Sequence, residues 1–467
     1  MKTYKMFLVL VFIFSVKIFS QAGGSIGISD ARSAAMGKTS ATSSFGLRAL
    51  GNNPANLFSD SSKHVELIIP FPLPNLSGSI GTNFMSLDEY NYFFGYKTKD
   101  ADGNTIGRYL TDADKNRMKN LFADGGAITG DAQVQYFAIS IKPSNSFGVF
   151  SFSMNDIISS NVTFPKGIVS IALDGNPVNQ VYNFNDTRMK SWWLRKYSIS
   201  YARSLSRKIS LGVSFNIVQG FAYAGLDHIN TQLTTGTGNV ITGKGEFLAY
   251  AAFSPDFNVK YDFDKSTTAK KDFKFSPFLT PAGNGFGFDF GLNAKLDNVW
   301  SFGFAITDIG SVKWNKNAAQ YSSSAPIYLD DLTNESQRDS LVKALVGKDS
   351  GKYISEFSTP LATALHLGAS MQLNNLLLAF DYNQGFNDQP RNSKKPRFSI
   401  GADWVLGFFA LRTGLSFGGF DKFNWGLGCG FDFGFLEMNF GTPDFESVVV
   451  PNSAKRITVA IDSRWKF

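Results

Sequence analysis

Residues 422–435 read Lys-Phe-Asn-Trp-Gly-Leu-Gly-Cys-Gly-Phe-Asp-Phe-Gly-Phe. Apolar side chains occupy every second position, and Lys, Asn, Gly and Asp occupy the positions between them. A period of two is the spacing at which the side chains of a β-strand point to one face of a sheet. This stretch therefore predicts a strand with one apolar face and one face of small and polar residues.

The same alternation recurs at 285–296, 361–373 and 409–417. These runs are long, because a tilted strand crosses a bilayer in about 9–11 residues, whereas strands of soluble sheets most often have about 5–6. Gly, Ser, Asn and Asp on the other face suit the lumen of a membrane barrel whose apolar side chains face lipid. The lumen-facing positions then include His366, Arg412, Asp432 and Asp289.

The connections between strands indicate how the sheet is wound. Seven short turns, one of them Ser254-Pro255-Asp256, alternate strictly with longer polar segments such as 86–132 and 309–360. Short periplasmic turns and long external loops are typical of an antiparallel up-and-down outer-membrane β-barrel. Seven hairpins with a first and a last strand give sixteen strands. The expected fold class is therefore all-β, with the barrel over 61–467.

The first residues have the layout of a secretory signal peptide. Lys2 and Lys5 precede an apolar core at 6–16, and Ser20 and Ala22 offer small residues for cleavage. We expect a signal peptide at 1–20, with Ala22 as the alternative cleavage position. Export and a barrel together place the mature protein in the cell outer membrane. No later stretch reaches the ~18 uninterrupted apolar residues of a membrane helix.

The last residues also fit this class of protein. Ile457, Val459, Ile461, Trp465 and Phe467 share one strand face, and Phe467 ends the sequence. This resembles the C-terminal strand of outer-membrane proteins, in which Trp465 and Phe467 would stand where the barrel-assembly machinery reads its signal. The alternative is an ordinary edge strand that happens to end in Phe.

Residues 112–122 predict a short helix in an external loop. Thr111 is suited to cap its N-terminus, and Gly125 and Gly126 follow its end. A binding role for this helix has no support in the sequence.

Residues 21–60 lack strand alternation and are rich in small residues, so we expect a compact plug in the lumen. Met36-Gly37, followed by Asn53-Pro54-Ala55, resembles the N-terminal hatch of the long-chain fatty-acid transporter superfamily of outer-membrane barrels. That FadL-like superfamily includes the shuttle barrel of the type IX secretion system. Residues 308–314 resemble a strand end in a related, functionally uncharacterised family of Bacteroidota barrels. The resemblance implies about fourteen strands, against the sixteen counted from turns.

The resemblance also implies a role for three residues. At the positions of Asn53, Pro54 and Ala55, hatch residues of the superfamily help to gate the passage of a hydrophobic ligand. The chain departs from its relatives between Lys38 and Arg48, where they often carry acidic residues and this sequence has none. The alternative is a structural turn, because Asn-Pro dipeptides form turns in any context.

Several other classes of function lack the residues that they need. A formal net charge of +7 with scattered basic residues does not indicate a nucleic-acid partner. Cys429 is the only cysteine, and His64, His228 and His366 are far apart, so we expect neither disulfide nor metal. No cofactor-binding pattern or Ser–His constellation is recognisable, and we expect no enzyme.

The leading functional hypothesis is passage or binding of a hydrophobic small molecule through a plugged barrel, in contact with outer-membrane lipid. The alternative is a non-transporting outer-membrane partner of a secretion or surface-assembly system, with secretion-system proteins bound to it. A general porin and an outer-membrane enzyme are the remaining alternatives. The sequence does not rank the first two, because barrels of one fold serve unrelated functions.

Overall fold

The structure is a computed structural model. It describes residues 30–58, 63–95, 97–99, 102–123, 125–144, 146–263, 267–270, 278–330, 335–337, 351–419 and 423–467. The expected signal peptide at 1–20 lies outside the described residues.

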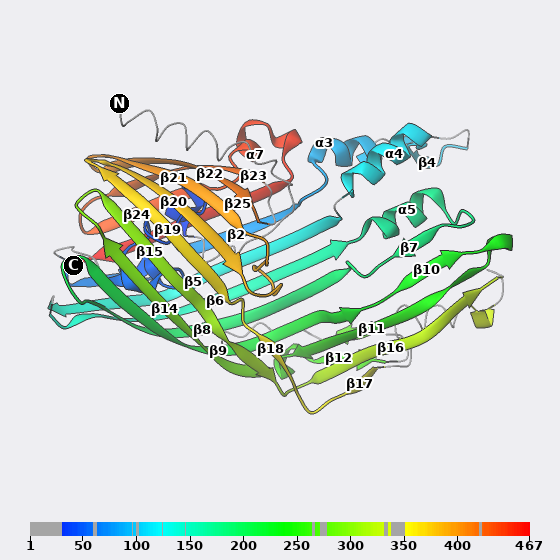
Figure 1. Cartoon of the computed structure of the whole chain (residues 1–467), viewed down its shortest axis with the longest axis horizontal. Coiled ribbons are helices and arrows are strands. Elements are labelled where there is room, and N and C mark those ends of the chain that lie inside the picture. Colours follow the sequence, from blue (N-terminus) through cyan, green and yellow to red (C-terminus); the bar gives the residue numbers. More distant parts are fainter. Residues whose placement is uncertain are drawn as a thin grey trace.

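The described strands close into one antiparallel ring (Figure 1). β1 and β2 share one place in it, because both pair with β5 on one side and with β25 on the other. The ring strands are β1 (Val65–Ile68), β2 (Asn75–Thr82), β5 (Gly126–Ser144), β6 (Gly148–Phe164), β8 (Arg188–Ser204), β9 (Ile209–Ile229), β14 (Gly283–Lys295), β15 (Trp300–Trp314), β19 (Ala364–Leu373), β20 (Leu376–Gly385), β21 (Arg397–Leu406), β22 (Phe409–Gly418), β23 (Phe423–Asp432), β24 (Leu436–Thr442) and β25 (Arg456–Lys466). With β1 and β2 counted as one place, the ring of described strands has fourteen.

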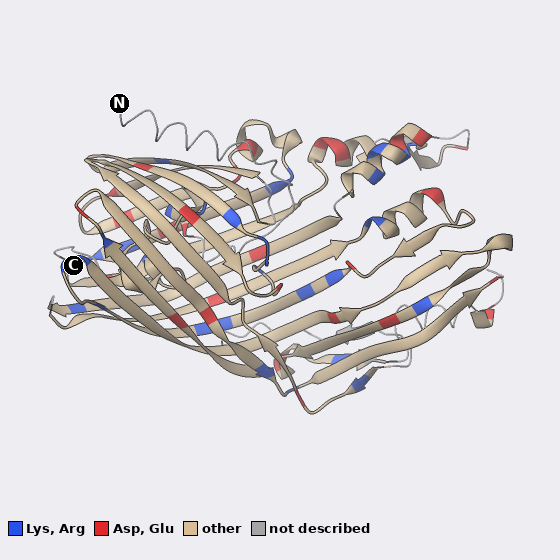
Figure 2. Cartoon of the chain, viewed as in Figure 1, with Lys and Arg blue, Asp and Glu red and all other residues tan. Residues whose placement is uncertain are grey.

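The ring is apolar outside and polar inside. Phe423, Trp425 and Leu427 are exposed, whereas Asn424 and Gly426 between them are buried, so the alternation predicted for this stretch is confirmed. The outer face of β9 repeats the pattern with residues that are 39–46% exposed: Ile209, Leu211, Val213, Phe215 and Ile217. Figure 2 shows long stretches of strand without a charged residue. An exposed apolar belt around a polar interior is the arrangement of barrels that face lipid.

The wall is much taller on one side than on the other. β5, β6, β8 and β9 have 19, 17, 17 and 21 residues, whereas each strand from β19 to β23 has 10. The long strands extend past the short ones at the end of the ring opposite the short turns, here called the loop end (Figure 1). Further strands continue the sheet there: β7 (Val181–Asn183), β10 (Gln232–Thr235), β11 (Ile241–Phe253), β16 (Ala318–Leu329), β17 (Gly351–Tyr353) and β18 (Phe357–Pro360).

The count of sixteen strands was wrong, and the cause lies in β9. β9 pairs with β14 from Ile209 to Gly220 and with β11 from Ala222 to Ile229. Its 21 residues exceed what one crossing needs, so its outer part takes a second partner rather than leaving an open edge. The turn at Ser254 exists, but it follows β11 outside the ring, and β12 (Val259–Asp262) pairs with β13 (Thr267–Lys270).

Short helices lie mainly in the loops. They are α3 (Leu87–Tyr90), η3 (Asn91–Gly95), α4 (Asp112–Leu121), α5 (Lys166–Asp174), η4 (Thr237–Asn239), η5 (Pro255–Phe257), α7 (Glu446–Val449) and η6 (Pro451–Ser453), and β3 (Lys97–Lys99) pairs with β4 (Thr105–Gly107). The helix predicted at 112–122 is confirmed as α4, with Thr111 as its cap. Within the described residues, no helix combines the length and apolarity needed to cross a membrane.

Candidate functional site

Residues 30–57, here called the N-terminal segment, lie against the inner face of the ring (dark blue in Figure 1). They form α2 (Ala31–Ala35), η1 (Gly46–Ala49) and η2 (Pro54–Leu57). Asp30 caps α2, because its carboxylate accepts a hydrogen bond from the Ser33 backbone N–H at 2.7 Å. Almost every residue of the segment is buried, although few of them are large and apolar.

Glycines of the wall let this backbone come close. A Cβ placed on Gly212 of β9 would lie 2.2 Å from the carbonyl carbon of Pro54, and one on Gly414 of β22 would lie 2.2 Å from that of Met36. Only glycine fits where two backbones meet at such distances. Further wall glycines in the same situation are Gly303, Gly426 and Gly441. The glycine-rich inner face is therefore complementary to the N-terminal segment.

A buried group of charges ties the segment to the place where the ring closes. Arg48 donates to Glu437 at 2.8 Å and to Asp462 at 2.9 Å. Arg464 donates to the other oxygen of Glu437 at 2.8 Å and to Glu66 at 3.0 Å. Glu66 belongs to β1, the first strand, and Asp462 and Arg464 belong to β25, the last. Arg48 of the segment thus neutralises two carboxylates of the ring, close to the place where the first and last strands pair.

A second group of buried charges lies on the neighbouring strands β21 and β22. Arg32 and Arg412 bind the two oxygens of Asp403 at 2.8 and 3.0 Å, and Arg412 also donates to Asn439 at 2.6 Å. Arg412, predicted to face the lumen, is therefore buried and shares the carboxylate of Asp403 with Arg32 of the N-terminal segment. Its role in any passage stays a prediction.

The other side of the segment is apolar. Leu47, Leu50 and Leu57 form one buried cluster with residues of β1, β5, β6 and β8. The wall residues of this cluster are Ile68, Ala138, Val149 and Ala202. The segment is therefore held by ion pairs on one side and by apolar packing on the other.

The three residues predicted to gate a ligand form the cap of η2. The Asn53 amide nitrogen donates to the carbonyls of Ala41 at 2.9 Å and of Leu292, in β14, at 3.2 Å. The Asn53 side-chain oxygen accepts from the Ala55 N–H at 3.2 Å, and Pro54 takes the first helical position. Asn53, Pro54 and Ala55 therefore build a buried turn fixed to the wall, and gating stays a prediction.

His366 is almost fully buried between neighbouring strands. One ring nitrogen lies 3.0 Å from the hydroxyl of Thr307 in β15, and the other contacts the side-chain oxygen of Asn383 in β20. Both nitrogens of His366 are thus occupied by residues of the wall. The prediction that the chain is no enzyme is not tested by this geometry.

Asp289, another predicted lumen residue, lies beside an irregularity of the wall. Its carboxylate accepts from Asn216 at 3.0 Å and from the Asp308 backbone N–H at 2.7 Å. The register of β14 and β15 shifts here, and Asp308 has a φ of 56°. A β-bulge changes the direction in which a side chain points. The side chain of Asp308, at this bulge, forms an ion pair with the buried Lys196.

The remaining predicted residues lie at the rim beside the C-terminus. Asp432 accepts from Lys466 at 2.6 Å, and 47% of its side chain is exposed. Trp465 donates to the carbonyl of Phe71 at 2.9 Å and stacks on Phe467, with ring centroids 6.3 Å apart. An assembly role for Trp465 and Phe467 stays a prediction.

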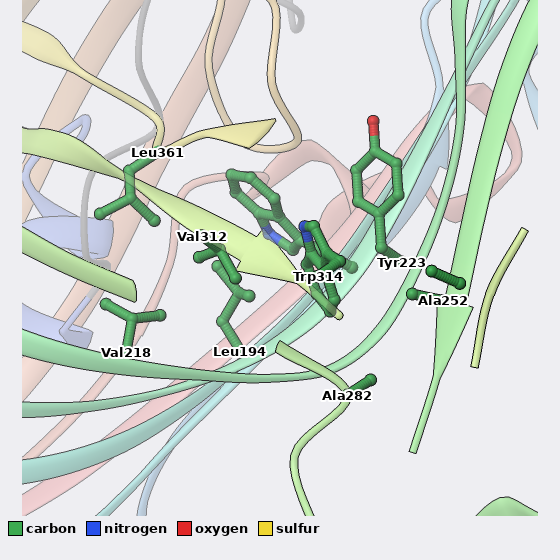
Figure 3. Close-up of a cluster of buried hydrophobic side chains, with 10 residues drawn as sticks. Leu194, Val218, Tyr223, Ala252, Ala282, Val312, Trp314 and Leu361 are labelled. Carbon is green, nitrogen blue, oxygen red and sulfur yellow. The ribbon is translucent and has the colours of Figure 1, made fainter. Parts of the chain in front are cut away.

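An apolar cluster lies inside the tall wall, near the point where β9 changes partner (Figure 3). Its buried members are Trp192, Leu194, Val218, Tyr223, Ala252, Ala282, Val312, Trp314, Ala318 and Leu361. Trp314 has no exposed surface, and its indole N–H donates to the Thr359 hydroxyl at 2.9 Å. Its ring centroid lies 5.5 Å from that of Tyr223. The cluster is apolar, whereas the neighbouring inner face is lined by polar residues such as Ser151, Ser153 and Asn155.

A cavity of about 40 Å³ opens beside this cluster. Its apolar lining residues are Ile157, Trp192, Leu194, Leu361, Ala362 and Pro390, and its polar ones are Lys196, Thr307, Asp308 and Arg391. Gly51 of the N-terminal segment completes the lining. The cavity is thus formed jointly by the wall and the segment.

The sequence did not identify Arg32 and Arg48 as important. A signal was present, because two arginines stand in a stretch of small residues with no acid between Lys38 and Arg48. Their acidic partners had to come from distant parts of the chain. Across the described residues, no group of three or more His, Cys, Asp or Glu side chains could hold a metal ion.

Comparison with known proteins gives a family and a set of similar structures. Residues 57–442 match a family described as "Family of unknown function (DUF5723)". No curated protein matches the sequence. Among solved structures, the toluene transporter TodX of P. putida is 14% identical, with a TM-score of 0.46 over 94% of this chain and 98% of that one. A FadL homologue of Pseudomonas aeruginosa is 12% identical, with a TM-score of 0.47 over 96% of this chain and 100% of that one.

Proposed function

The chain belongs to the family of unknown function DUF5723, and we propose that it is an outer-membrane β-barrel that binds and passes a small hydrophobic molecule. The apolar belt around the ring supports residence in a lipid bilayer. The expected signal peptide at 1–20 supports export to the outer membrane. In that orientation the short turns face the periplasm and the loop end faces outwards.

The observation that carries the proposal is the apolar cluster around Trp192, Leu194, Trp314 and Leu361. Ligand sites lined by aromatic and aliphatic side chains favour apolar molecules. A barrel that conducts ions and polar solutes does not require such a cluster in its interior. The cluster borders a cavity, and side chains that line a binding site commonly change rotamer when a partner binds.

The N-terminal segment supports a plugged barrel over a general porin. Its backbone touches wall glycines, its arginines pair with wall carboxylates and its leucines join a wall cluster. A general porin needs a continuous aqueous lumen. A segment held to the wall by ion pairs and by apolar packing supports a plug in the space that such a channel would need.

The partner hypothesis has no specific observation in its favour. It predicts a bound protein subunit, which the carrier hypothesis does not require. Native mass spectrometry of the purified protein separates the two hypotheses, because it detects a bound subunit and a bound small molecule as different masses.

The proposal is tested by entry of N-phenyl-1-naphthylamine, a fluorescent apolar probe, into cells that make the protein. We expect faster entry with the wild-type protein than with Ala362→Arg, which places a long charged side chain in the cavity. Thr105→Arg adds the same side chain at an exposed loop position and serves as the matched control. All three proteins must show heat-modifiable migration, which reports a folded barrel. Equal entry with wild type and Ala362→Arg would contradict the proposal.

A further inference from the structure

Two short turns at the loop end expose an unusual amount of apolar surface. Val448, Val449 and Val450 of the α7 turn are 66%, 60% and 51% exposed. Tyr90 and Phe94 of the α3–η3 turn are each 53% exposed, with ring centroids 5.5 Å apart. Both turns belong to the short side of the ring, where the strands end earliest (Figure 1).

The two turns are joined at their bases. The Leu87 backbone N–H, at the start of α3, donates to the carbonyl of Ala454, just after η6, at 3.2 Å. Leu87 is itself 45% exposed. In Figure 1, α3 and α7 lie close together above the place where β2 meets β25. We call this surface the valine–aromatic patch; its members are Leu87, Tyr90, Phe94, Val448, Val449 and Val450.

The patch continues the apolar belt of the ring. Phe445, directly before α7, packs edge-on against Trp425 of β23 at 5.2 Å, and its N–H donates to the Trp425 carbonyl at 2.7 Å. Trp425 is an outward-facing residue of the belt. Below the patch, Ile80 and Ile457 pair across the closing strands and are 68% and 58% exposed. The chain therefore leaves β24 on the outer side of the wall.

Water is a poor environment for this patch. Exposed contiguous apolar surface marks contact with a partner or a membrane. Tyr and Trp are enriched at the membrane–water interface, because their rings are apolar and their polar atoms can be hydrated. The charged residues around the patch, Asp88, Glu446 and Lys455, are exposed and can stay at the level of the headgroups.

We propose that the valine–aromatic patch is seated in the outer leaflet of the membrane, with acyl chains of lipid as its occupant. The proposal rests on the membrane location proposed above. The short side of the ring then ends in the lipid interface, whereas the tall side stands clear of it. The patch then extends the apolar belt beyond the exposed pair Ile80 and Ile457, at the strands that close the ring.

Spin labels test the proposal directly. Cys429 is the only cysteine, so Cys429→Ser gives a cysteine-free chain for single labels. Val449→Cys reports the patch, Val459→Cys on β25 reports the belt, and Val178→Cys, 45% exposed beyond α5, reports the tall side. Each labelled protein is placed in liposomes, and its accessibility to oxygen, which enters lipid, is compared with that to a water-soluble nickel complex.

We expect the label at Val449 to favour oxygen, as the label at Val459 does, and the label at Val178 to favour nickel. Nickel accessibility at Val449 equal to that at Val178 would overturn the proposal. Shielding of Val449 from both reagents would overturn it as well, since it would indicate a second copy or another protein on the patch. Nickel accessibility at Val459 would instead show that the proposed membrane location itself is wrong.

Discussion

Arg48 and Glu437 stand 389 residues apart in the sequence, and their side chains meet at 2.8 Å inside the ring. The contact joins the N-terminal segment to β24, next to the strand that closes the barrel. Arg48 also holds Asp462 of β25. One guanidinium thus connects the N-terminal segment with the closing edge of the wall around it.

Arg48→Met is expected to destabilise the barrel strongly. It leaves the buried carboxylates of Glu437 and Asp462 with one partner fewer, and breaking a buried ion pair in this way costs about 3–5 kcal/mol. The free energy of unfolding in urea, followed by heat-modifiable migration, measures this loss. Arg203→Met, at an exposed position of β8, is the matched control and is expected to change stability by at most about 0.5 kcal/mol. Equal stability of the two variants would contradict the account of the ion pairs.

Gly212→Ala is expected to loosen the N-terminal segment. The added Cβ would lie 2.2 Å from the Pro54 carbonyl carbon, and neither backbone can yield without moving the segment. We expect steady ion conductance in planar bilayers for this variant and none for wild type. Gly130→Ala is the control, since a Cβ there meets nothing within 4 Å. The same conductance from Gly212→Ala and Gly130→Ala would show that the segment does not close the lumen.

Trp314→Ala is expected to cost about 3–5 kcal/mol, the usual penalty for emptying a buried aromatic site. Trp314 is fully buried in the apolar cluster. Trp404→Ala removes the same side chain from the outer face of β21, where it is 49% exposed, and should cost clearly less. Urea unfolding of both variants in the same detergent measures the difference. A larger loss for Trp404→Ala would contradict the packing described here.

Asp114 of α4 is expected to titrate at an unusually low pH. The hydroxyl of Tyr92 donates to it at 2.6 Å, and Thr111 donates through its backbone N–H and hydroxyl, which together lower the pKa of Asp114 from 3.8 to about 2. The stabilisation of the folded loop is therefore complete above about pH 4 and is lost as the pH falls towards 2. Carboxyl NMR measures the midpoint, which Tyr92→Phe should raise. A wild-type midpoint at 3.8 would contradict the assignment.

The ring strands were predictable because each obeys a local rule. Alternation of large apolar residues with small polar ones, as at 422–435, needs no knowledge of the rest of the chain. The position of β11 was not predictable in this way. Its residues do not show the regular alternation of the ring strands, and its pairing depends on the length of β9, whose outer part extends beyond the ring. On its other side β11 pairs with β16, about 80 residues further along the chain, and such a pairing depends on the whole sheet.

The candidate site was predictable only in outline. The small-residue composition of 21–60 predicted a plug in the lumen, of which the structure shows residues 30–57 against the inner face, and the Asn53-Pro54 dipeptide predicted a turn. The charges that hold the segment could not be paired from sequence, since Arg48 and Asp462 are 414 residues apart. The apolar cluster could not be predicted because Trp192 of β8, Val312 of β15 and Leu361, between β18 and β19, come together only in the folded ring.

The most direct test of the proposed function is native mass spectrometry of the protein purified from its own outer membrane in mild detergent. We predict a bound mass of the size of a small hydrophobic molecule on wild type, reduced on Ala362→Arg and retained on Thr105→Arg. A bound protein subunit and no small molecule on wild type would contradict the carrier account and favour the partner hypothesis.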